Sequence, residues 1–174
     1  INDNTPLIIA NSDQIVDMNF SDFVDDAKTR DLDGSILSFI DSKRDPKWSF
    51  VSLNDNNLVT AVKEKDPISD YATVGIYYFK RGIDFVEGAI DMILQQDTVN
   101  NEYYTCPVYN ILIKKKLDIG IYNIKESEMH GIGTPEDLNS YLEKLEITSW
   151  NLFLIKLNLN LDYLNQTLLS LKEH

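Results

Sequence analysis

The sequence predicts an α/β fold with a mixed, mostly parallel sheet flanked by helices. Along the 174 residues, β-prone runs alternate with amphipathic segments of helical period, which is typical of such folds. The run Leu7–Ala10 is apolar throughout and is followed by polar residues, as expected of a strand buried on both faces of a parallel sheet. Because 43% of the residues are hydrophobic, the chain can bury a sizeable core.

The first half of the chain is predicted to continue with a helix, a strand and a hairpin. Ser21 is a good N-cap for a helix over residues 22–28, whose first turn carries acidic residues that favour the helix dipole. A second strand is expected over residues 35–40. The β-prone runs 48–53 and 58–62 flank four Asn and Asp residues that tolerate left-handed backbone, which predicts a hairpin.

The second half is predicted to alternate strands and helices. Residues 73–79 form a strand rich in β-branched and aromatic side chains, and apolar residues over 85–93 recur at helical spacing. A helix over about 107–115 and a strand over 117–124 follow. Thr134 then caps a last helix of the domain, because a proline and two acidic residues come directly after it.

We divide the chain at residue 145, because its composition changes there. Residues 1–145 are predicted to form the α/β domain, and residues 146–174 a Leu- and Asn-rich extension. Leucines at helical spacing predict that the extension is a long amphipathic helix, which packs on the domain or forms a homo-oligomer with a second copy, although alternation over 157–161 is also compatible with a strand. Since Ile1 lies only a few residues before a buried strand, we expect that the domain lacks its N-terminal part.

The formal net charge of −12 argues against two classes of partner. Nucleic acid and anionic membrane surfaces both need a basic protein surface. Phosphorylated substrates would need a local positive charge or a metal ion within this acidic field. No segment resembles a signal peptide or a membrane-spanning helix, so the cytoplasm is the expected location.

The chain contains one cysteine, Cys106, which excludes an internal disulfide and a multi-cysteine zinc site. Beside Pro107, the favoured interpretation is a small residue of the core. The alternative is a reactive thiol, but no basic cluster adjoins it in the sequence.

Asp13 is the first candidate for a functional role. It follows the first predicted strand, and ligands of open α/β sheets bind beyond the carboxyl ends of strands. An aspartate there can hold Mg²⁺ while substrate phosphates complete the coordination shell. The alternative is a turn stabilised by local side-chain hydrogen bonds.

Three further segments contain candidate residues. Lys65, at a strand end after Glu64, could bind a phosphate as a point charge, although an exposed charge cluster has the same pattern. Gly75 permits the close approach of a ligand or of another part of the chain. Glu102 could accept sugar hydroxyls, or cap a helix. His130 stands alone, so the glycines around it are expected to serve a turn.

Six short motifs occur in an order that resembles a known family. They are LIIANSD (residues 7–13), PKWSFV (46–51), VKEKDP (62–67), ATVGIY (72–77), NEY (101–103) and GIGTPEDL (131–138). In this order they resemble the second, C-terminal part of the sugar-phosphate nucleotidyltransferases, which include glucose-1-phosphate thymidylyltransferases and their capsule and lipopolysaccharide relatives. The resemblance covers roughly residues 5–145 and implies the Rossmann-like fold of nucleotide-diphospho-sugar transferases.

The resemblance also implies a reaction and roles for individual residues. In that reaction a phosphate oxygen of a sugar 1-phosphate attacks the α-phosphorus of a nucleoside triphosphate, and Mg²⁺ offsets the charge on the phosphates. Asp13 would be the catalytic metal ligand, and Lys65 would hold the sugar phosphate. The residues implied in substrate binding are Trp48, Ser49, Glu64, Thr73, Gly75 and Glu102, of which the two glutamates would bind sugar hydroxyls.

The sequence departs from the family pattern in two ways. The family's glycine-rich loop, which holds the triphosphate, has no counterpart in this chain. Many members also carry a second metal-binding aspartate where Gly131 stands. Nucleotidyl transfer in surface polysaccharide synthesis is the leading hypothesis. The alternatives are a glycosyltransferase that uses a nucleotide-sugar, and a non-catalytic subunit that binds a sugar nucleotide.

Overall fold

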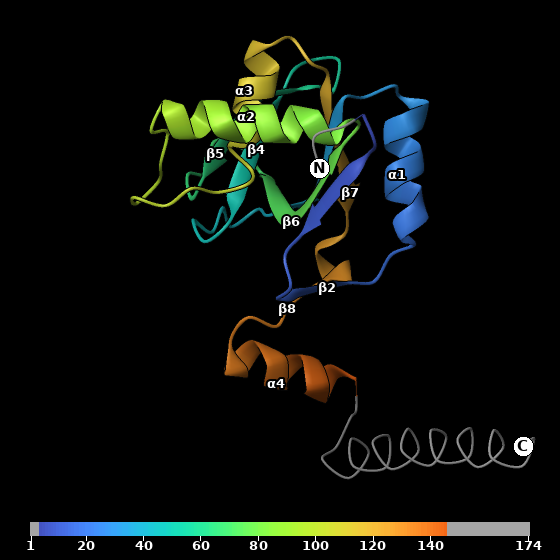
Figure 1. Ribbon diagram of the computed structural model, residues 1–174. Helices are drawn as coiled ribbons and strands as arrows, with labels where there is room; N and C mark the ends of the chain where they lie inside the picture. The colour runs from blue at the N-terminus through green and yellow to red at the C-terminus, as the bar shows by residue number, and fades with distance from the viewer. Residues whose placement is uncertain (1–3, 146–174) are drawn as a thin grey trace, which may run out of the picture. The chain divides into compact units, whose positions relative to one another are not determined.

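The computed structural model describes residues 4–145 (Figure 1). The chain divides into two compact units, residues 1–129 and 130–174. The predicted extension 146–174 lies outside the described residues, and the domain boundary at residue 145 stays a prediction. Between residues 4 and 145, no helix combines the length and apolar character needed to cross a bilayer.

The first unit is built on a six-stranded sheet. Its strands are β1 (Leu7–Ala10), β3 (Gly34–Ile40), β4 (Ser49–Leu53), β5 (Val59–Glu64), β6 (Tyr71–Phe79) and β7 (Ile119–Ile124). The order is β5-β4-β6-β3-β7, with β1 also paired to β6. The unit further contains β2 (Gln14–Val16), α1 (Phe20–Thr29), α2 (Gly82–Leu94), α3 (Val108–Lys114) and the 3₁₀ helix η1 (Glu126–Glu128).

The prediction of a mixed sheet flanked by helices is confirmed, but the prediction that it is mostly parallel is wrong. β6 runs antiparallel to β1, β3 and β4, and β4 runs antiparallel to β5. Within this sheet, β3 and β7 pair in parallel. β6 lies between strands of opposite direction, so most ladders in the sheet are antiparallel.

The position of β1 also differs from the prediction. Its four residues alternate between half-buried and exposed, so β1 is not covered on both faces. It pairs in antiparallel register with the second half of β6, from Leu7 opposite Phe79 to Ala10 opposite Ile76. A continuous apolar run therefore formed a half-buried antiparallel strand rather than a central parallel one.

Local signals predicted the helix and hairpin positions closely, with one error in a cap. α1 begins at Phe20, and its N-cap is Asn19, whose side chain accepts a hydrogen bond from the Ser21 backbone N–H at 3.3 Å. Ser21 is therefore not the cap. The hairpin of β4 and β5 is confirmed, and the Asn54 side chain accepts the backbone N–H groups of Asn56 and Leu58 at 2.9 and 3.0 Å.

The sheet of Figure 1 has two hydrophobic core clusters of side chains, one on each face. One cluster contains Tyr77 and Phe79 of β6 with side chains of α2 and α3. The other contains Val74 and Tyr78 of the same strand with Phe23 of α1. Because successive side chains of a strand point to opposite faces, β6 contributes to both cores.

Two neighbouring residues attach α3 to the sheet. The buried Tyr109 hydroxyl lies 2.8 Å from the Tyr78 carbonyl oxygen, to which it donates. The Asn110 side-chain amide pairs with β5 as a further strand would: its oxygen accepts the Val62 N–H at 2.8 Å and its nitrogen donates to the Val62 carbonyl at 2.9 Å. This contact gives hydrogen-bond partners to the backbone N–H and carbonyl of Val62, two residues before β5 ends.

The described part of the second unit contains the end of β8 (Met129–Gly131) and the helix α4 (Pro135–Lys144). Thr134 caps α4 as predicted, and its hydroxyl accepts the Asp137 N–H at 3.1 Å. His130 is 9% exposed and its ring lies 5.0 Å from that of Tyr141, so it packs as a structural residue of this unit.

We expect Asn110→Ala to lower the free energy of unfolding by about 1–3 kcal/mol, because two backbone groups of Val62 lose their partner. Asn110→Asp is the matched variant: it retains the acceptor for the Val62 N–H and loses the donor, so it should lie in between. Urea denaturation followed by circular dichroism measures both. An unchanged midpoint for Asn110→Ala would show that water replaces the amide without cost.

Candidate functional site

Six of the eight predicted site residues lie in one connected group where β4 begins and β5 ends. The group contains Trp48, Ser49, Glu64, Lys65, Thr73 and Glu102. The antiparallel register places Ser49 opposite Glu64, and the Ser49 hydroxyl donates to the Glu64 carboxylate. The hairpin thus brings together residues that are 15 positions apart in the sequence.

Lys65 directly follows β5, and its backbone is in the left-handed conformation with a φ of 55°. Its N–H donates to the Trp48 carbonyl at 3.1 Å. A non-glycine residue in this region is strained, and such strain is concentrated at functional sites. The Trp48 ring itself packs edge-on against Phe39 of the core at 5.5 Å, so its indole contributes to stability, whereas its backbone carbonyl makes the contact with Lys65.

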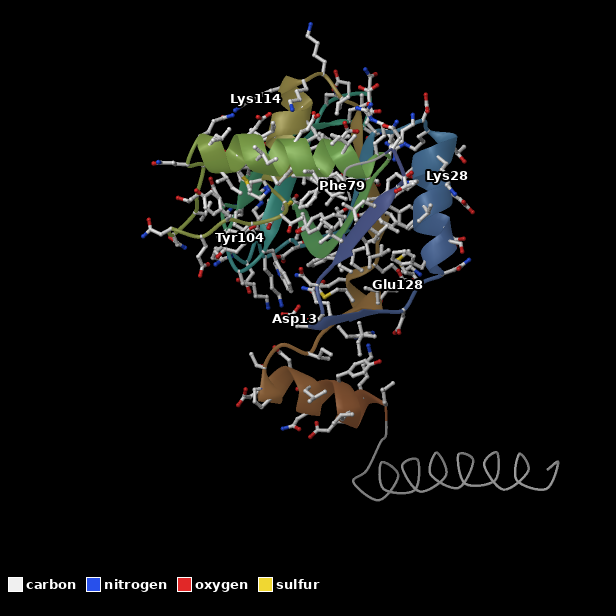
Figure 2. The ribbon with its side chains drawn as sticks, in the orientation of Figure 1. Asp13, Lys28, Phe79, Tyr104, Lys114 and Glu128 are labelled. Carbon is white, nitrogen blue, oxygen red and sulfur yellow. The ribbon has the colours of Figure 1, made fainter. Side chains whose placement is uncertain are left out.

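The Lys65 ammonium is exposed and donates to the hydroxyl of Tyr104 at 2.6 Å. Tyr104 in turn donates to the Glu102 carboxylate. The hydrogen bond with Tyr104 is the main reason why the pKa of Lys65 is raised, and Glu64 and Glu102 add smaller favourable charges. The lysine is therefore fully charged at neutral pH. Figure 2 labels Tyr104 among the side chains of this region.

Buried polar side chains lie beneath this group. Burial raises the pKa of the Cys106 thiol to about 12, against hydrogen bonds with Tyr77, Thr73 and Ser49 that lower it. Burial likewise raises the pKa of Tyr77 well above its ordinary value. Both groups stay protonated and neutral at physiological pH. The interpretation of Cys106 as a core residue is thus supported, since it is 1% exposed and its thiolate is disfavoured.

Gly75 belongs to a different set of contacts. Its φ is +89°, and its carbonyl accepts the Asn11 N–H at 2.9 Å. A Cβ at this position would lie 2.4 Å from Asn11 Nδ2 and 2.9 Å from Gln14 Oε1. The close approach that glycine permits is therefore made by side chains of the chain itself, which supports the packing interpretation of Gly75.

Asp13 lies in the exposed loop between β1 and β2, directly before Gln14 (Figure 2). Between residues 4 and 145, no three His, Cys, Asp or Glu residues form a cluster that could enclose a metal ion. Mg²⁺ does not need such a cage, because one or two carboxylates, waters and substrate phosphates can complete its octahedral shell. Asp13 therefore fits a Mg²⁺ ion that is held mainly by the substrate's phosphates.

Gly131 stands where the family resemblance leads us to expect a second metal-binding aspartate. Its surroundings do not require a glycine. No described heavy atom lies within 4 Å of a Cβ built there, and its φ is not positive. Packing within its unit therefore gives no reason for glycine at this position.

A separate cleft of about 500 Å³ lies beyond the carboxyl ends of β3 and β7. None of the predicted site residues lines it. Its lining includes four carboxylates, from Asp17, Asp22, Glu126 and Glu128, against the single lysine Lys125. A phosphate would be repelled there, so charge favours the Lys65 group as the phosphate site.

Comparison with protein families identifies the chain. A family profile described as nucleotidyl transferase matches residues 1–104, which is more than half of the sequence. The chain belongs to the nucleotidyl transferase family. All eight predicted site residues lie within the matched segment. The match ends before residue 145, to which the motif resemblance extended.

Solved structures of the nucleotidyl transferase type have the same fold. A nucleoside-diphosphate-sugar pyrophosphorylase from Vibrio cholerae RC9 is 27% identical, with a TM-score of 0.69 over 79% of this chain and 56% of its own. A protein described as a glucose-1-phosphate thymidylyltransferase, from Bacillus anthracis, is 15% identical, with a TM-score of 0.59 over 79% of this chain and 53% of its own. The inositol-1-phosphate CTP transferase of T. maritima is 14% identical, with a TM-score of 0.52 over 81% of this chain and 54% of its own.

The last two similarities show the fold alone. The chain spans slightly more than half the length of these three proteins. A comparison with curated protein sequences gives no match.

Sequence reasoning gave no role in this candidate site to three of its residues, namely Tyr77, Tyr104 and Cys106. Tyr104 stands two residues after Glu102, so in an extended segment both side chains point to the same side. That spacing is the signal that could have indicated their contact. Tyr77 and Cys106 are buried, so they could affect a ligand only through their contacts with the other residues of the group.

We expect Cys106 to resist alkylation in the folded protein. With a pKa of about 12, its thiolate fraction at pH 8 is roughly 1,000-fold below that of a thiol with a pKa of 9.0. Iodoacetamide labelling followed by mass spectrometry, with a urea-unfolded sample as control, measures the difference. Equal rates in both samples would show that the thiol is accessible and ionised.

The same raised pKa has a consequence for stability. Folding favours the protonated thiol. Its contribution to the free energy of unfolding is therefore complete below pH 9 and is lost as the pH rises toward 12. Between pH 9 and pH 11, the free energy of unfolding should therefore decrease less for the Cys106→Ala variant than for the unmodified chain. Urea denaturation at both pH values tests this, and parallel losses would contradict it.

We expect Gly75→Ala to lower the free energy of unfolding by about 1–3 kcal/mol, because its backbone is left-handed and a Cβ would collide with Asn11. Gly131→Ala is the control, because no described atom adjoins that Cβ; its effect should stay within about 0.5 kcal/mol. Equal effects of the two substitutions, measured by urea denaturation, would rule out this explanation of Gly75.

Proposed function

We propose that the protein containing this chain transfers a nucleotidyl group from a nucleoside triphosphate to a sugar 1-phosphate or a similar phosphorylated small molecule, with release of pyrophosphate. The observation that carries the proposal is the group around Lys65 in a chain of the nucleotidyl transferase family. An exposed ammonium stands beside two carboxylates that can accept hydroxyls. This combination suits a molecule that carries both a phosphate and hydroxyl groups.

Lys65 is proposed to bind the phosphate of the sugar phosphate as a point charge. Against a net charge of −12, a phosphate will bind only where positive charge is concentrated locally. Among the described ion pairs, Lys65 takes part in none, so no carboxylate within ion-pair distance neutralises its ammonium.

Glu64 and Glu102 are proposed to bind hydroxyl groups of the sugar. Each already accepts one hydroxyl, from Ser49 and Tyr104 respectively. A carboxylate has about four acceptor positions, so each retains capacity for a ligand. Ser49, Thr73 and the Trp48 side chain are proposed to contribute to the same binding group.

The protein's part in the reaction is positioning. A phosphate oxygen of the sugar phosphate attacks the α-phosphorus of the triphosphate, and the bond to the departing pyrophosphate breaks. Lys65 orients the attacking phosphate and offsets its charge, while the glutamates fix the sugar. Mg²⁺, for which Asp13 is the proposed ligand, would neutralise charge on the triphosphate when bound. The motif resemblance is the support for placing the reaction in surface polysaccharide synthesis, for capsule or lipopolysaccharide.

We expect the protein expressed from the complete gene to release pyrophosphate with Mg²⁺ when a nucleoside triphosphate and a suitable sugar 1-phosphate are supplied. Asp13→Ala should abolish release. Lys65→Ala should raise the KM for the sugar phosphate by about 10- to 100-fold, because one charged hydrogen bond to phosphate is lost. A coupled pyrophosphate assay with a panel of sugar 1-phosphates and the five common triphosphates measures both effects.

Lys63→Ala is the matched control, because Lys63 is an exposed lysine of β5, two residues before Lys65, and its loss changes the net charge equally. It should leave the KM within about twofold. If no pair of substrates yields pyrophosphate but a nucleotide-sugar is hydrolysed, the glycosyltransferase hypothesis replaces this one. Binding of a sugar nucleotide without any turnover would favour the non-catalytic subunit.

A further inference from the structure

The segment before α3 contains a tight turn that places Glu102. Val99 and Glu102 exchange two backbone hydrogen bonds of 3.0 Å each. Between them, Asn100 and Asn101 both have positive φ, of 53° and 63°. Two left-handed residues between paired neighbours define a type I′ turn, which asparagine tolerates better than most residues. The orientation of the Glu102 side chain is thus set by its own turn.

Tyr104 connects this turn to the end of β5. Its hydroxyl has one proton and two acceptor positions. The Lys65 ammonium has only donors, so the hydroxyl oxygen accepts from Lys65, at 2.6 Å, and its proton goes to the Glu102 carboxylate. The direction of both hydrogen bonds is therefore determined. Lys65 and Tyr104 are 39 residues apart, so this contact joins two separate segments.

The hydroxyl also separates a positive from a negative group. Other lysines of the chain pair directly with carboxylates, as Lys80 does with Asp31 at 2.7 Å. Lys65 meets a neutral oxygen instead, with the Glu102 carboxylate one hydrogen bond further away. A direct ion pair would compete with a phosphate for the ammonium, whereas a phenol oxygen occupies only one of its three protons.

We propose that Tyr104 is a positioning residue, which holds the Lys65 ammonium ready for a ligand's phosphate and keeps it from pairing with Glu102. This role rests on the proposed function, in which Lys65 binds the phosphate. Tyr104 touches no reacting atom and acts only through Lys65. Its loss should therefore weaken phosphate binding only while Lys65 is present.

Tyr104→Phe removes the hydroxyl and little else, and Tyr103→Phe is the matched control. The neighbouring Tyr103 is also a partly exposed tyrosine, but its hydroxyl faces the Ile93 carbonyl at 3.5 Å. Both variants should fold as the unmodified chain does, which circular dichroism and thermal melting would verify. Inorganic phosphate is the probe, because it tests the Lys65 contact without requiring the sugar, the triphosphate or turnover.

We expect Tyr104→Phe to raise the Kd for inorganic phosphate by about 3- to 10-fold, as for the loss of one supporting hydrogen bond. Tyr103→Phe should leave it unchanged. In a Lys65→Ala background, Tyr104→Phe should have no further effect, because the two residues act as one unit. Nuclear magnetic resonance titrations of the 174-residue chain measure these constants.

The same spectra report the pKa of Lys65 through its ε-carbon. The pKa is compared in a Glu102→Gln background, because a released ammonium could otherwise pair with the Glu102 carboxylate, which would itself raise the pKa. There, since the Tyr104 hydrogen bond is the main cause of the raised pKa, Tyr104→Phe should lower it toward the ordinary value. A Lys65 pKa that does not fall overturns the positioning role, as does equal weakening of phosphate binding with and without Lys65. If the pKa falls but Lys65→Ala binds phosphate normally, the Tyr104 contact stands and the proposed phosphate role of Lys65 fails.

Discussion

The antiparallel hydrogen bonds of β6 are the constraint on which the rest of the first unit depends. β6 pairs with β3 on one side and with β1 and β4 on the other, and eight of its nine residues are buried. Its side chains enter both cores, so a slip by one residue would exchange the two faces and expose apolar surface on each. The register that avoids this also places Thr73 against Cys106 and Gly75 against Asn11. The functional group and the packing of the sheet therefore share one strand.

Much of the secondary structure could be predicted because its signals act over a few residues. Thr134 with its following proline started a helix as predicted, and the Asn-rich turn at Asn54 closed a hairpin. Strand direction could not be predicted in the same way. The run Leu7–Ala10 has the same apolar character in a parallel or an antiparallel ladder, and its neighbour β6 is more than 60 positions away. Burial and direction of β1 are properties of that distant pairing, so its local sequence does not contain them.

The site shows the same division between local and distant information. Ser49 and Glu64 meet across the hairpin that the sequence predicts. The contact between Lys65 and Tyr104 could not be predicted, since it depends on how the segment before α3 folds back on β5. For Gly75, the sequence left a ligand and a packing partner equally open. The structure favours packing, because the space beside its Cα is taken by Asn11 and Gln14.

In the proposed function, this acidic protein binds a phosphate at one lysine whose direct hydrogen-bond partner is a neutral hydroxyl, rather than at a basic cluster. Burial raises the pKa of Cys106 and Tyr77, so both remain uncharged beneath the group. The two nearby carboxylates each accept a hydroxyl, and neither is ion-paired with Lys65 among the described residues. In the proposed function, the single positive charge attracts one phosphate group, whereas additional phosphates would approach the carboxylates. This half of the site suits a phosphate monoester that carries hydroxyl groups, and a triphosphate would need its charge offset elsewhere.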